Sequence, residues 1–135
     1  MIYQRQMAVE FNHCDPAGIV FYPRYFEMTN SVVENFFGAG LGYSYARMMA
    51  EASGVPTAGL NARFLAPSRL GDILDFDLEI KRIGRTSVGF LLSCRCGGEL
   101  RMTVDLTLVW VSGGRPAPWP DVLRAPMQAF MERAT

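Results

Sequence analysis

The residues best suited to chemistry lie in one short stretch, residues 12–23, which reads Asn-His-Cys-Asp-Pro-Ala-Gly-Ile-Val-Phe-Tyr-Pro. Asp15 precedes a proline and is therefore held extended, while Pro23 stands where a helix can begin without losing a hydrogen bond. The unpaired N–H groups of a helix N-terminus suit a developing oxyanion, and a nearby carboxylate can attack the polarised carbonyl or activate a water molecule. The stretch therefore indicates acyl transfer, for which a thioester is suitable because a thiolate leaves without a strong general acid.

The same stretch also has a purely structural explanation. Asp first, Pro second and Gly fourth is the residue order of a type I turn, so Asp15 to Gly18 can be a turn without further function. His13 lies two residues before Asp15, and in an extended segment both side chains point the same way. His13 either orients Asp15 and lowers its pKa, or is an ordinary hydrogen-bonded polar residue, and both interpretations stay open.

Two elements flank this stretch. Side chains of residues 3–11 alternate between two faces, which predicts a strand. From Tyr22 to Phe37, apolar or small residues recur at helical spacing and leave only a narrow polar line, which predicts a long helix wrapped by its neighbours. Gly38, Gly40 and Gly42 are expected to end this helix.

The rest of the chain predicts a sheet. Residues 44–53 fit a short helix closed by Gly54, and residues 57–66, 74–81, 86–96 and 99–112 have strand patterns. Short turns join these strands, among them a hairpin at Gly97-Gly98, so the sheet is expected to be antiparallel. A proline-rich piece after residue 115 leads into a short tail helix. Wrapping the apolar face of the sheet around the long helix buries both, which predicts an α+β fold.

Composition and charge exclude several classes of protein. The 135 residues suit one domain spanning residues 1–135, and 13 basic residues balance 13 acidic ones, so no field draws the chain to nucleic acid or an acidic membrane. No apolar run reaches the ~18 residues of a membrane span, and without an export signal the expected compartment is the cytoplasm. His13 is the only histidine, and Cys94 and Cys96 fit as small buried hydrophobes, so no metal site and no other cofactor is expected.

Residues 9–25 closely resemble the 4-hydroxybenzoyl-CoA thioesterase family of hotdog proteins, most specifically in Asp-Pro-Ala-Gly-Ile-Val before an aromatic-Tyr-Pro. A second stretch, Asn61-Ala62-Arg63-Phe64 followed by Pro67 and Gly71-Asp72, is similar to the second and third strands of that family. The resemblance runs from about residue 5 to residue 112. It implies a hotdog fold, in which an antiparallel five-stranded sheet wraps around a long central helix.

The resemblance also implies roles for individual residues. Asp15 would be the catalytic carboxylate, acting as a nucleophile or as a general base, and the backbone N–H of Tyr22 would polarise the thioester carbonyl. Asn30 stands where the family has an acid that pairs with a substrate hydroxyl, and an amide can still bind a hydroxyl, though without charge assistance. The resemblance also places the active site at a subunit interface built from both chains, where Asn61 would line the pocket of Asp15. His13 is a third candidate for binding the substrate.

A basic turn supplies the candidate CoA site. The stretch Lys-Arg-Ile-Gly-Arg-Thr-Ser begins at residue 81 and resembles the family stretch that holds the CoA phosphates: Arg85 and Ser87 match it, while Gly84 and Thr86 replace basic residues. The candidate CoA-binding residues are Arg82, Arg85, Thr86 and Ser87. Arginines and backbone donors at such a turn would suit a pyrophosphate and a 3′-phosphate. The alternative is a hairpin tip whose charges only face solvent.

Together these features predict an acyl-CoA thioesterase that hydrolyses an aromatic or a short- to medium-chain acyl-CoA. Two alternatives remain, a hotdog hydratase or dehydratase and a non-catalytic acyl-CoA-binding protein. The first needs a paired carboxylate and histidine, for which only His13 and Asp15 are candidates, and the second leaves the charge of Asp15 without a task. Exposed sheet edges and an apolar content of 50% predict a homo-oligomer, a dimer or a tetramer.

Overall fold

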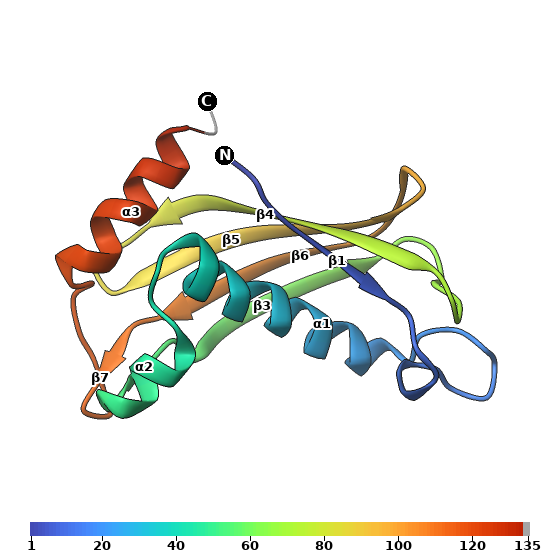
Figure 1. Ribbon diagram of the computed structural model, residues 1–135, viewed down its shortest axis with the longest axis horizontal. Helices are drawn as coiled ribbons and strands as arrows, with labels where there is room; N and C mark the ends of the chain where they lie inside the picture. The colour runs from blue at the N-terminus through green and yellow to red at the C-terminus, as the bar shows by residue number, and fades with distance from the viewer. Residues whose placement is uncertain (134–135) are drawn as a thin grey trace.

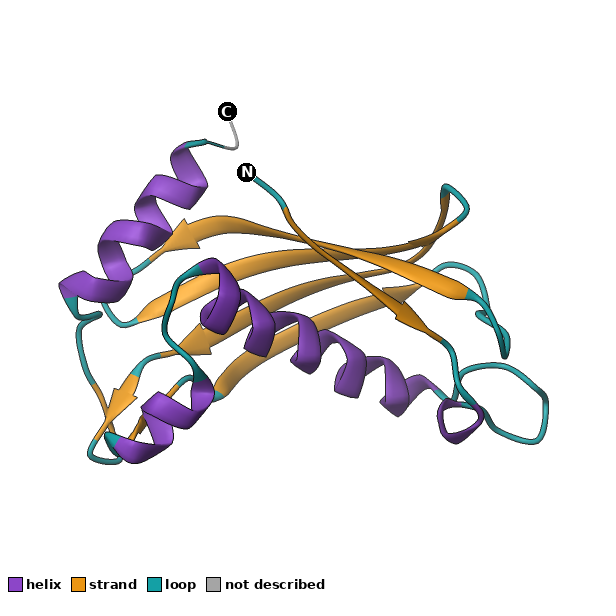
Figure 2. Ribbon diagram, viewed as in Figure 1, coloured by secondary structure: helices purple, strands orange, loops and turns teal. Residues whose placement is uncertain are grey.

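Five antiparallel strands form one sheet in the order β1-β4-β5-β6-β3, and a long helix lies across one face of it (Figure 1, Figure 2). The computed structural model describes residues 1–133. The strands are β1 (Tyr3–Ala8), β3 (Thr57–Phe64), β4 (Ile73–Ile83), β5 (Ser87–Cys96) and β6 (Glu99–Val109), and the helix is α1 (Tyr22–Asn35). The predicted α+β fold, with a five-stranded antiparallel sheet wrapped around a central helix, is confirmed.

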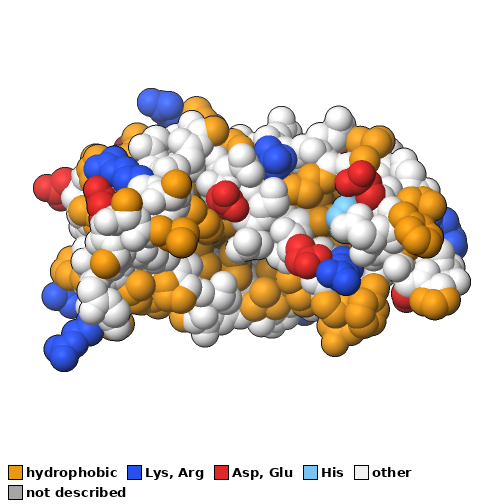
Figure 3. Space-filling view, turned by 60° about the horizontal axis from the view of Figure 1, so that its bottom comes forward, with side chains coloured by type: hydrophobic (Ala, Val, Ile, Leu, Met, Phe, Trp, Pro, Cys, Tyr) orange, Lys and Arg blue, Asp and Glu red, His pale blue; other side chains and the backbone are white. Residues whose placement is uncertain are grey.

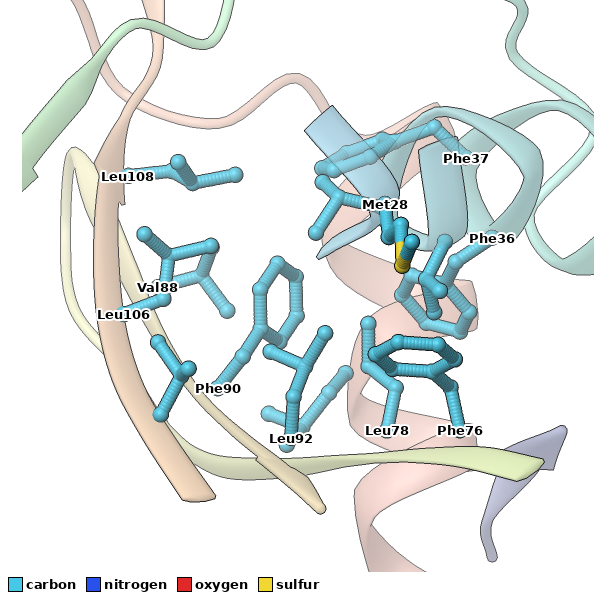
Figure 4. Packing of buried hydrophobic residues seen from close by; sticks show 14 of the residues in the cluster. Met28, Phe36, Phe37, Phe76, Leu78, Val88, Phe90, Leu92, Leu106 and Leu108 are labelled. Atoms are coloured by element: carbon cyan, nitrogen blue, oxygen red, sulfur yellow. The ribbon is translucent and has the colours of Figure 1, made fainter. Parts of the chain in front are cut away.

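The core fills the space between the sheet and α1. Alternate residues of the three central strands point toward the helix and are almost completely buried, as period-2 patterning requires (Figure 4). They include Phe76, Leu78, Phe90, Leu92, Met102, Val104 and Leu106. The opposite face of the sheet is polar, with Gln6 donating to Asp75 and Gln4 to Asp77 across neighbouring strands. Only the apolar face of the sheet therefore needs to be covered by α1.

Helix α1 is built as its sequence predicts, with a proline in its first turn and buried residues at helical spacing. The glycines that were expected to end the helix do not do so directly, because the helix continues through a π-helical turn, Phe36–Gly40. A Cβ at Gly40 would come within 2.9 Å of the Phe36 ring, so glycine allows this turn to close over a buried aromatic residue. Gly42, with φ +72°, then reverses the chain.

Three predicted elements end three residues earlier than expected, and smaller differences occur at β3 and β4. The first strand ends at Ala8 instead of residue 11, because a 3₁₀ turn, Phe11–His13, follows it and leaves the Phe11 side chain 83% exposed. The short helix α2 (Tyr45–Ala50) ends before its predicted limit, since Ala52 has φ +53°. The last long strand stops at Val109, and a separate strand follows it.

The remaining elements cover the end of the sheet where α2 lies. A small sheet combines β2 (Ser53–Gly54), β7 (Val111–Ser112) and β8 (Arg115–Pro116), and α3 (Asp121–Glu132) is the predicted tail helix (Figure 1). The predicted hairpin at Gly97-Gly98 is confirmed, since both glycines have positive φ. No helix within residues 1–133 is long and apolar enough to cross a membrane.

The packing around Phe36 gives a direct test of the core. Its ring is fully buried and lies 4.8 Å from that of Phe130 and 5.7 Å from that of Phe90, measured between ring centroids. Phe36→Ala should lower the free energy of unfolding by about 3–5 kcal/mol, since the cavity cannot collapse among rigid rings. Urea denaturation at one protein concentration measures the change.

The matched control is Phe11→Ala, which removes the same ring from an exposed position. It should change stability by less than about 0.5 kcal/mol. Equal losses in the two variants would contradict the core described here.

Candidate active site

Asp15 stands at the start of a turn, as its sequence predicts. The Gly18 N–H donates to the Asp15 carbonyl at 2.9 Å, and the Asp15 N–H donates to the Ile19 carbonyl at 3.0 Å. The Ala17 N–H donates to Oδ1 of Asp15 at 2.9 Å. Among residues 1–133 no donor contacts Oδ2 of this half-buried carboxylate. The turn therefore orients Asp15 through one oxygen and leaves the other available.

The helix start that follows this turn supplies a donor that is unpaired within residues 1–133. The Phe21 N–H donates to the His13 carbonyl at 2.9 Å, which folds residues 13–21 back on themselves. Tyr22 is the first residue of α1, and its N–H has no acceptor in the described part of the chain. Pro23 has no N–H, and Arg24 donates to the Phe21 carbonyl at 2.8 Å. The Tyr22 N–H is thus the donor at this helix end that can bind an added oxygen.

A buried polar network holds the Asp15 turn against the sheet. The Val20 N–H donates to the carbonyl of Ser68 at 2.8 Å. The fully buried Ser68 hydroxyl accepts from the Tyr25 hydroxyl of α1 at 2.8 Å and from Nη1 of Arg101 at 3.2 Å. Arg101 also donates to Asp72 at 2.9 Å. One network therefore joins α1, β6 and the loop that carries Asp15.

The hydrogen bonds of this network stabilise the ionised forms of Asp72 and Arg101. The backbone N–H of Arg69 and the Arg101 guanidinium hold the pKa of Asp72 below its usual value. Asp72 in turn raises the pKa of Arg101. Burial raises the pKa of Tyr25, so its hydroxyl remains a donor to Ser68. Sequence spacing gives no signal for these residues, because Tyr25 and Ser68 are 43 positions apart.

His13 has a structural partner other than Asp15. Its Nδ1 accepts a hydrogen bond from the Glu10 N–H at 2.9 Å, so in the neutral ring the proton is on Nε2. No hydrogen bond within residues 1–133 joins His13 to Asp15. The ring lines a groove of about 350 Å³ between β1 and α1. These contacts support the interpretation of an ordinary hydrogen-bonded residue, and its role in binding substrate stays a prediction.

Asn30 lines two adjoining cavities, of about 300 and 110 Å³, between α1, α2 and β3. Tyr45 lines both cavities too, and neither its hydroxyl nor the Asn30 amide has a hydrogen-bond partner in the described part of the chain. Burial, with the charge of Glu34, raises the pKa of Tyr45 to about 12. The other walls are largely apolar, namely Phe26, Val33, Met48, Met49, Val55, Pro56, Leu60, Leu106 and Leu108. The sequence prediction included Asn30 but missed Tyr45.

Asn61 lies on the other side of the sheet. In β3, Leu60 and Ala62 pair with Leu106 and Val104 of β6, which face the helix, so Asn61 and its partner Asp105 face outward. Within one chain, the structure therefore does not bring Asn61 to Asn30. The place of Asn61 in the pocket of Asp15, at an interface between two chains, stays a prediction.

The basic turn joins β4 to β5. Arg82 extends across Gly89, where a Cβ would lie 3.0 Å from its Cγ, and donates to the hydroxyls of Thr107 at 3.1 Å and Ser87 at 3.4 Å. The Arg85 side chain is exposed and Thr86 is half-buried. The turn is at the opposite end of β4 from Asp72, a separation of ~35 Å for an 11-residue strand. One chain therefore does not bring this turn to Asp15.

Strand β3 is an uncovered sheet edge with apolar side chains. Leu60 is 44% and Phe64 is 48% exposed, and the Phe64 ring lies 6.0 Å from the exposed Tyr22 ring, measured between centroids. Hydrophobic side chains are visible along this side of the molecule (Figure 3). An unpaired edge of this kind normally needs a cover.

Within residues 1–133, no three His, Cys, Asp or Glu side chains are grouped so as to hold a metal ion. Burial raises the pKa of Cys94 to about 12, so this residue is an unreactive thiol.

The comparisons with known proteins agree with this fold. The model of the thioesterase-like superfamily matches residues 9–127, and the chain belongs to that superfamily. The 4-hydroxybenzoyl-CoA thioesterase of Pseudomonas sp. (strain CBS-3) is 33% identical over 85 residues, 61% of this chain. The match spans 60% of the length of that relative.

Solved structures identify the hotdog fold. A Staphylococcus aureus protein in complex with CoA superimposes with a TM-score of 0.92 at 16% identity, over 98% of this chain and 85% of the other. An Asp-to-Asn variant of 4-hydroxybenzoyl-CoA thioesterase, in complex with 4-hydroxybenzoyl-CoA, superimposes with a TM-score of 0.85 at 26% identity, over 93% of this chain and 98% of the other. The resemblance stated from the sequence is thereby confirmed at the level of fold and family.

The lowered pKa of Asp72 gives a prediction for acid stability. A carboxylate whose pKa is lower in the folded state adds stability above its unfolded pKa of ~3.9, and this stability is lost as the pH falls through the folded pKa. Asp72→Asn should therefore reduce the melting temperature at pH 7 and flatten its decline in acid. Melting curves between pH 2 and 7 test this, with Asp75→Asn on the exposed outer face as the control. Parallel acid profiles of the wild type and Asp72→Asn would contradict the network.

Proposed function

We propose that this chain is an acyl-CoA thioesterase, a single hotdog domain that hydrolyses an aromatic or a short- to medium-chain acyl-CoA to the free acid and CoA. One observation carries the proposal. The Asp15 turn leaves one carboxylate oxygen without a donor, and the chain that follows folds back to begin α1 at Tyr22, whose N–H has no acceptor within residues 1–133. The superfamily match and the relative named for 4-hydroxybenzoyl-CoA support the same activity.

The mechanism uses the two groups together. The thioester carbonyl oxygen accepts the Tyr22 N–H, and the helix dipole stabilises the negative charge that develops on this oxygen. Asp15 then acts in one of two ways. As a nucleophile it attacks the carbonyl carbon, expels the CoA thiolate, and forms an anhydride that water cleaves. As a general base it removes a proton from the attacking water, and the same thiolate leaves.

The acyl group is proposed to occupy the cavities beside Asn30. Their apolar walls suit an aromatic ring or a short chain, and their unpartnered polar groups, the Asn30 amide and the Tyr45 hydroxyl, suit a neutral hydroxyl or carbonyl on that group. The charge of Glu34, which disfavours the tyrosinate form of Tyr45, also disfavours an anionic acyl group. Asn30 lies eight residues after Tyr22 in α1, so this residue of the proposed acyl cavity is ~12 Å along the helix axis from the proposed carbonyl donor.

The complete site is proposed to need two chains. A two-fold axis through β3 would pair the exposed edges of two sheets antiparallel and cover Leu60 and Phe64. This arrangement reverses the second chain, so the end of its sheet that carries the β4–β5 turn would lie at the Asp15 end of the first. It accounts for the separation, within one chain, of the candidate CoA turn from the other end of β4, which is ~35 Å away. The assembly is proposed to be a dimer, alone or within a tetramer.

A non-catalytic acyl-CoA-binding protein is the second candidate, because the turn alone explains the hydrogen bond between Ala17 and Asp15. A hotdog hydratase or dehydratase has less support, since no hydrogen bond within residues 1–133 pairs His13 with Asp15 as acid and base. Release of free thiol from acyl-CoA separates hydrolysis from both alternatives.

Asp15→Asn is the first test of the mechanism. The amide oxygen can still accept the Ala17 N–H, so the turn and the melting temperature should be preserved while the nucleophile or base is lost. We expect kcat to fall by about 100-fold or more with KM changed by less than about threefold. A thiol-reactive dye measures turnover across aromatic and aliphatic acyl-CoAs. Asp75→Asn is the matched control, and retention of more than about a tenth of the wild-type kcat by Asp15→Asn would remove Asp15 from catalysis.

Leu60→Asp tests the two-chain site. A charge on the edge of β3 should prevent pairing of the sheets, so light scattering should give the mass of one chain, 15.0 kDa, in place of a multiple of it. Because Leu60 also lines the proposed acyl cavity, the mass is the deciding measurement; the monomer should in addition lose acyl-CoA hydrolysis, because the turn and Asp15 are then separated. Val122→Asp, which places the same charge at an exposed apolar position of α3, should leave mass and activity unchanged. A wild-type species of 15.0 kDa that hydrolyses acyl-CoA would contradict the shared site.

A further inference from the structure

The C-terminal segment holds the β4–β5 turn through its carbonyl groups. Nη2 of Arg124 donates to the carbonyl oxygens of Gly84 at 2.8 Å and Arg85 at 3.3 Å. The Trp119 N–H donates to the Arg85 carbonyl at 3.1 Å, and its indole N–H donates to the Ser87 carbonyl at 2.9 Å. Neither Arg124 nor Trp119 belongs to the residues predicted from the sequence.

These contacts fix the direction of two consecutive peptide groups. The peptide bonds that follow Gly84 and Arg85 are trans, and in a trans peptide the C=O and the N–H point in opposite directions. Both carbonyls converge on one nitrogen of Arg124. The N–H groups of Arg85 and Thr86, which complete the same two peptides, therefore both point away from Arg124.

The side of the turn that faces away from Arg124 has donors without acceptors. Neither the Arg85 N–H nor the Thr86 N–H has an acceptor within residues 1–133, and the Arg85 guanidinium has no ion pair there. In the same part of the chain, Arg82 and Arg124 also have no carboxylate partner. Backbone N–H groups that point the same way beside an unpaired guanidinium form a typical anion site.

We infer that Arg124 is a positioning residue for CoA, because it aligns the Arg85 and Thr86 N–H groups on a phosphate of the ligand. This inference rests on the proposed function and adds to it a residue from α3. Arg124 acts from the side opposite to the ligand: it donates to the Gly84 carbonyl and shares the Arg85 carbonyl with the Trp119 N–H, so both carbonyls stay turned away from the phosphate. Its effect is therefore confined to the phosphate-bearing part of the substrate.

The experiment compares two substrates with the same acyl group, acyl-CoA and the S-acyl pantetheine, which has no phosphate. Arg124→Met keeps the aliphatic stem and removes the donors. It should raise KM for acyl-CoA about tenfold and leave kcat unchanged, because phosphate contacts bind the ground state and the transition state alike. KM for the acyl-pantetheine should stay at the wild-type value. A loss of fold or of Asp15 function would instead change the kinetic constants for both substrates.

Two further variants sharpen the result. Arg124→Lys retains a donor that can reach one carbonyl, so its KM for acyl-CoA should lie between those of the wild type and Arg124→Met. Arg95→Met removes a guanidinium from the polar face of β5, near the opposite end of that strand, and should change neither KM. Equal changes for the two substrates, or no change for either, would overturn the role of Arg124.

Calorimetry with CoA alone separates this inference from the proposed function. If the wild type binds CoA but hydrolyses no thioester, the proposed function fails, and weaker CoA binding by Arg124→Met still supports the positioning role. If wild type and Arg124→Met bind CoA equally, or if the wild type does not bind it at all, the inference is wrong whatever the activity.

Discussion

The buried Ser68 is the point on which the candidate site depends. Its carbonyl accepts the Val20 N–H of the Asp15 loop, and its hydroxyl accepts from Tyr25 of α1 and Arg101 of β6. A polar group removed from water must find such partners, since an unsatisfied one costs about 1–3 kcal/mol. Because each partner comes from a different element, the loop, the helix and the sheet can satisfy Ser68 only in one relative arrangement. The position of the Asp15 turn against the helix start follows from that arrangement.

The same sheet that fixes Asp15 separates it from the basic turn. Strand β4 begins beside the Arg101 network and ends in the turn that contains Arg85, so the two candidate halves of the site lie at opposite ends of one strand. A helix-covered sheet of this kind also leaves β3 as an exposed edge with Leu60 and Phe64 uncovered. The proposed pairing of two β3 edges would answer both problems, since it would cover the apolar side chains and bring unlike ends together.

The secondary structure was largely predictable because alternation and helical spacing report burial directly. The central strands and α1 follow their patterns, since a one-residue shift would turn every core side chain outward. The prediction failed for Phe11, which continues the alternation of β1 but belongs to a 3₁₀ turn closed by the His13 ring. Periodicity cannot detect such a turn, because the pattern depends only on side-chain types and not on the hydrogen bond that ends the strand.

The site was predictable only in part. The Asp15 turn and the helix start adjoin in sequence, so spacing alone indicated both. Arg101, Ser68 and Arg124 act through contacts between residues more than 30 positions apart, and no local pattern encodes such contacts. A similar limit applies to Asn61. The face of the sheet to which it belongs follows from the pairing of β3 with β6. The match of residues 61–64 to the family gives no information on that pairing.

The structural and catalytic explanations of Asp15 are compatible because a carboxylate has two oxygens. The turn uses Oδ1, which accepts the Ala17 N–H, and this bond fixes the side chain without occupying Oδ2. Local side-chain hydrogen bonds of this kind are the reason that Asp begins turns. For catalysis the same bond provides preorganisation, since a carboxylate held in one rotamer loses less entropy when it reacts than a mobile one. An Asp that fulfils its turn role therefore does not count against the proposed catalytic role, because the turn leaves the second oxygen without a donor within residues 1–133.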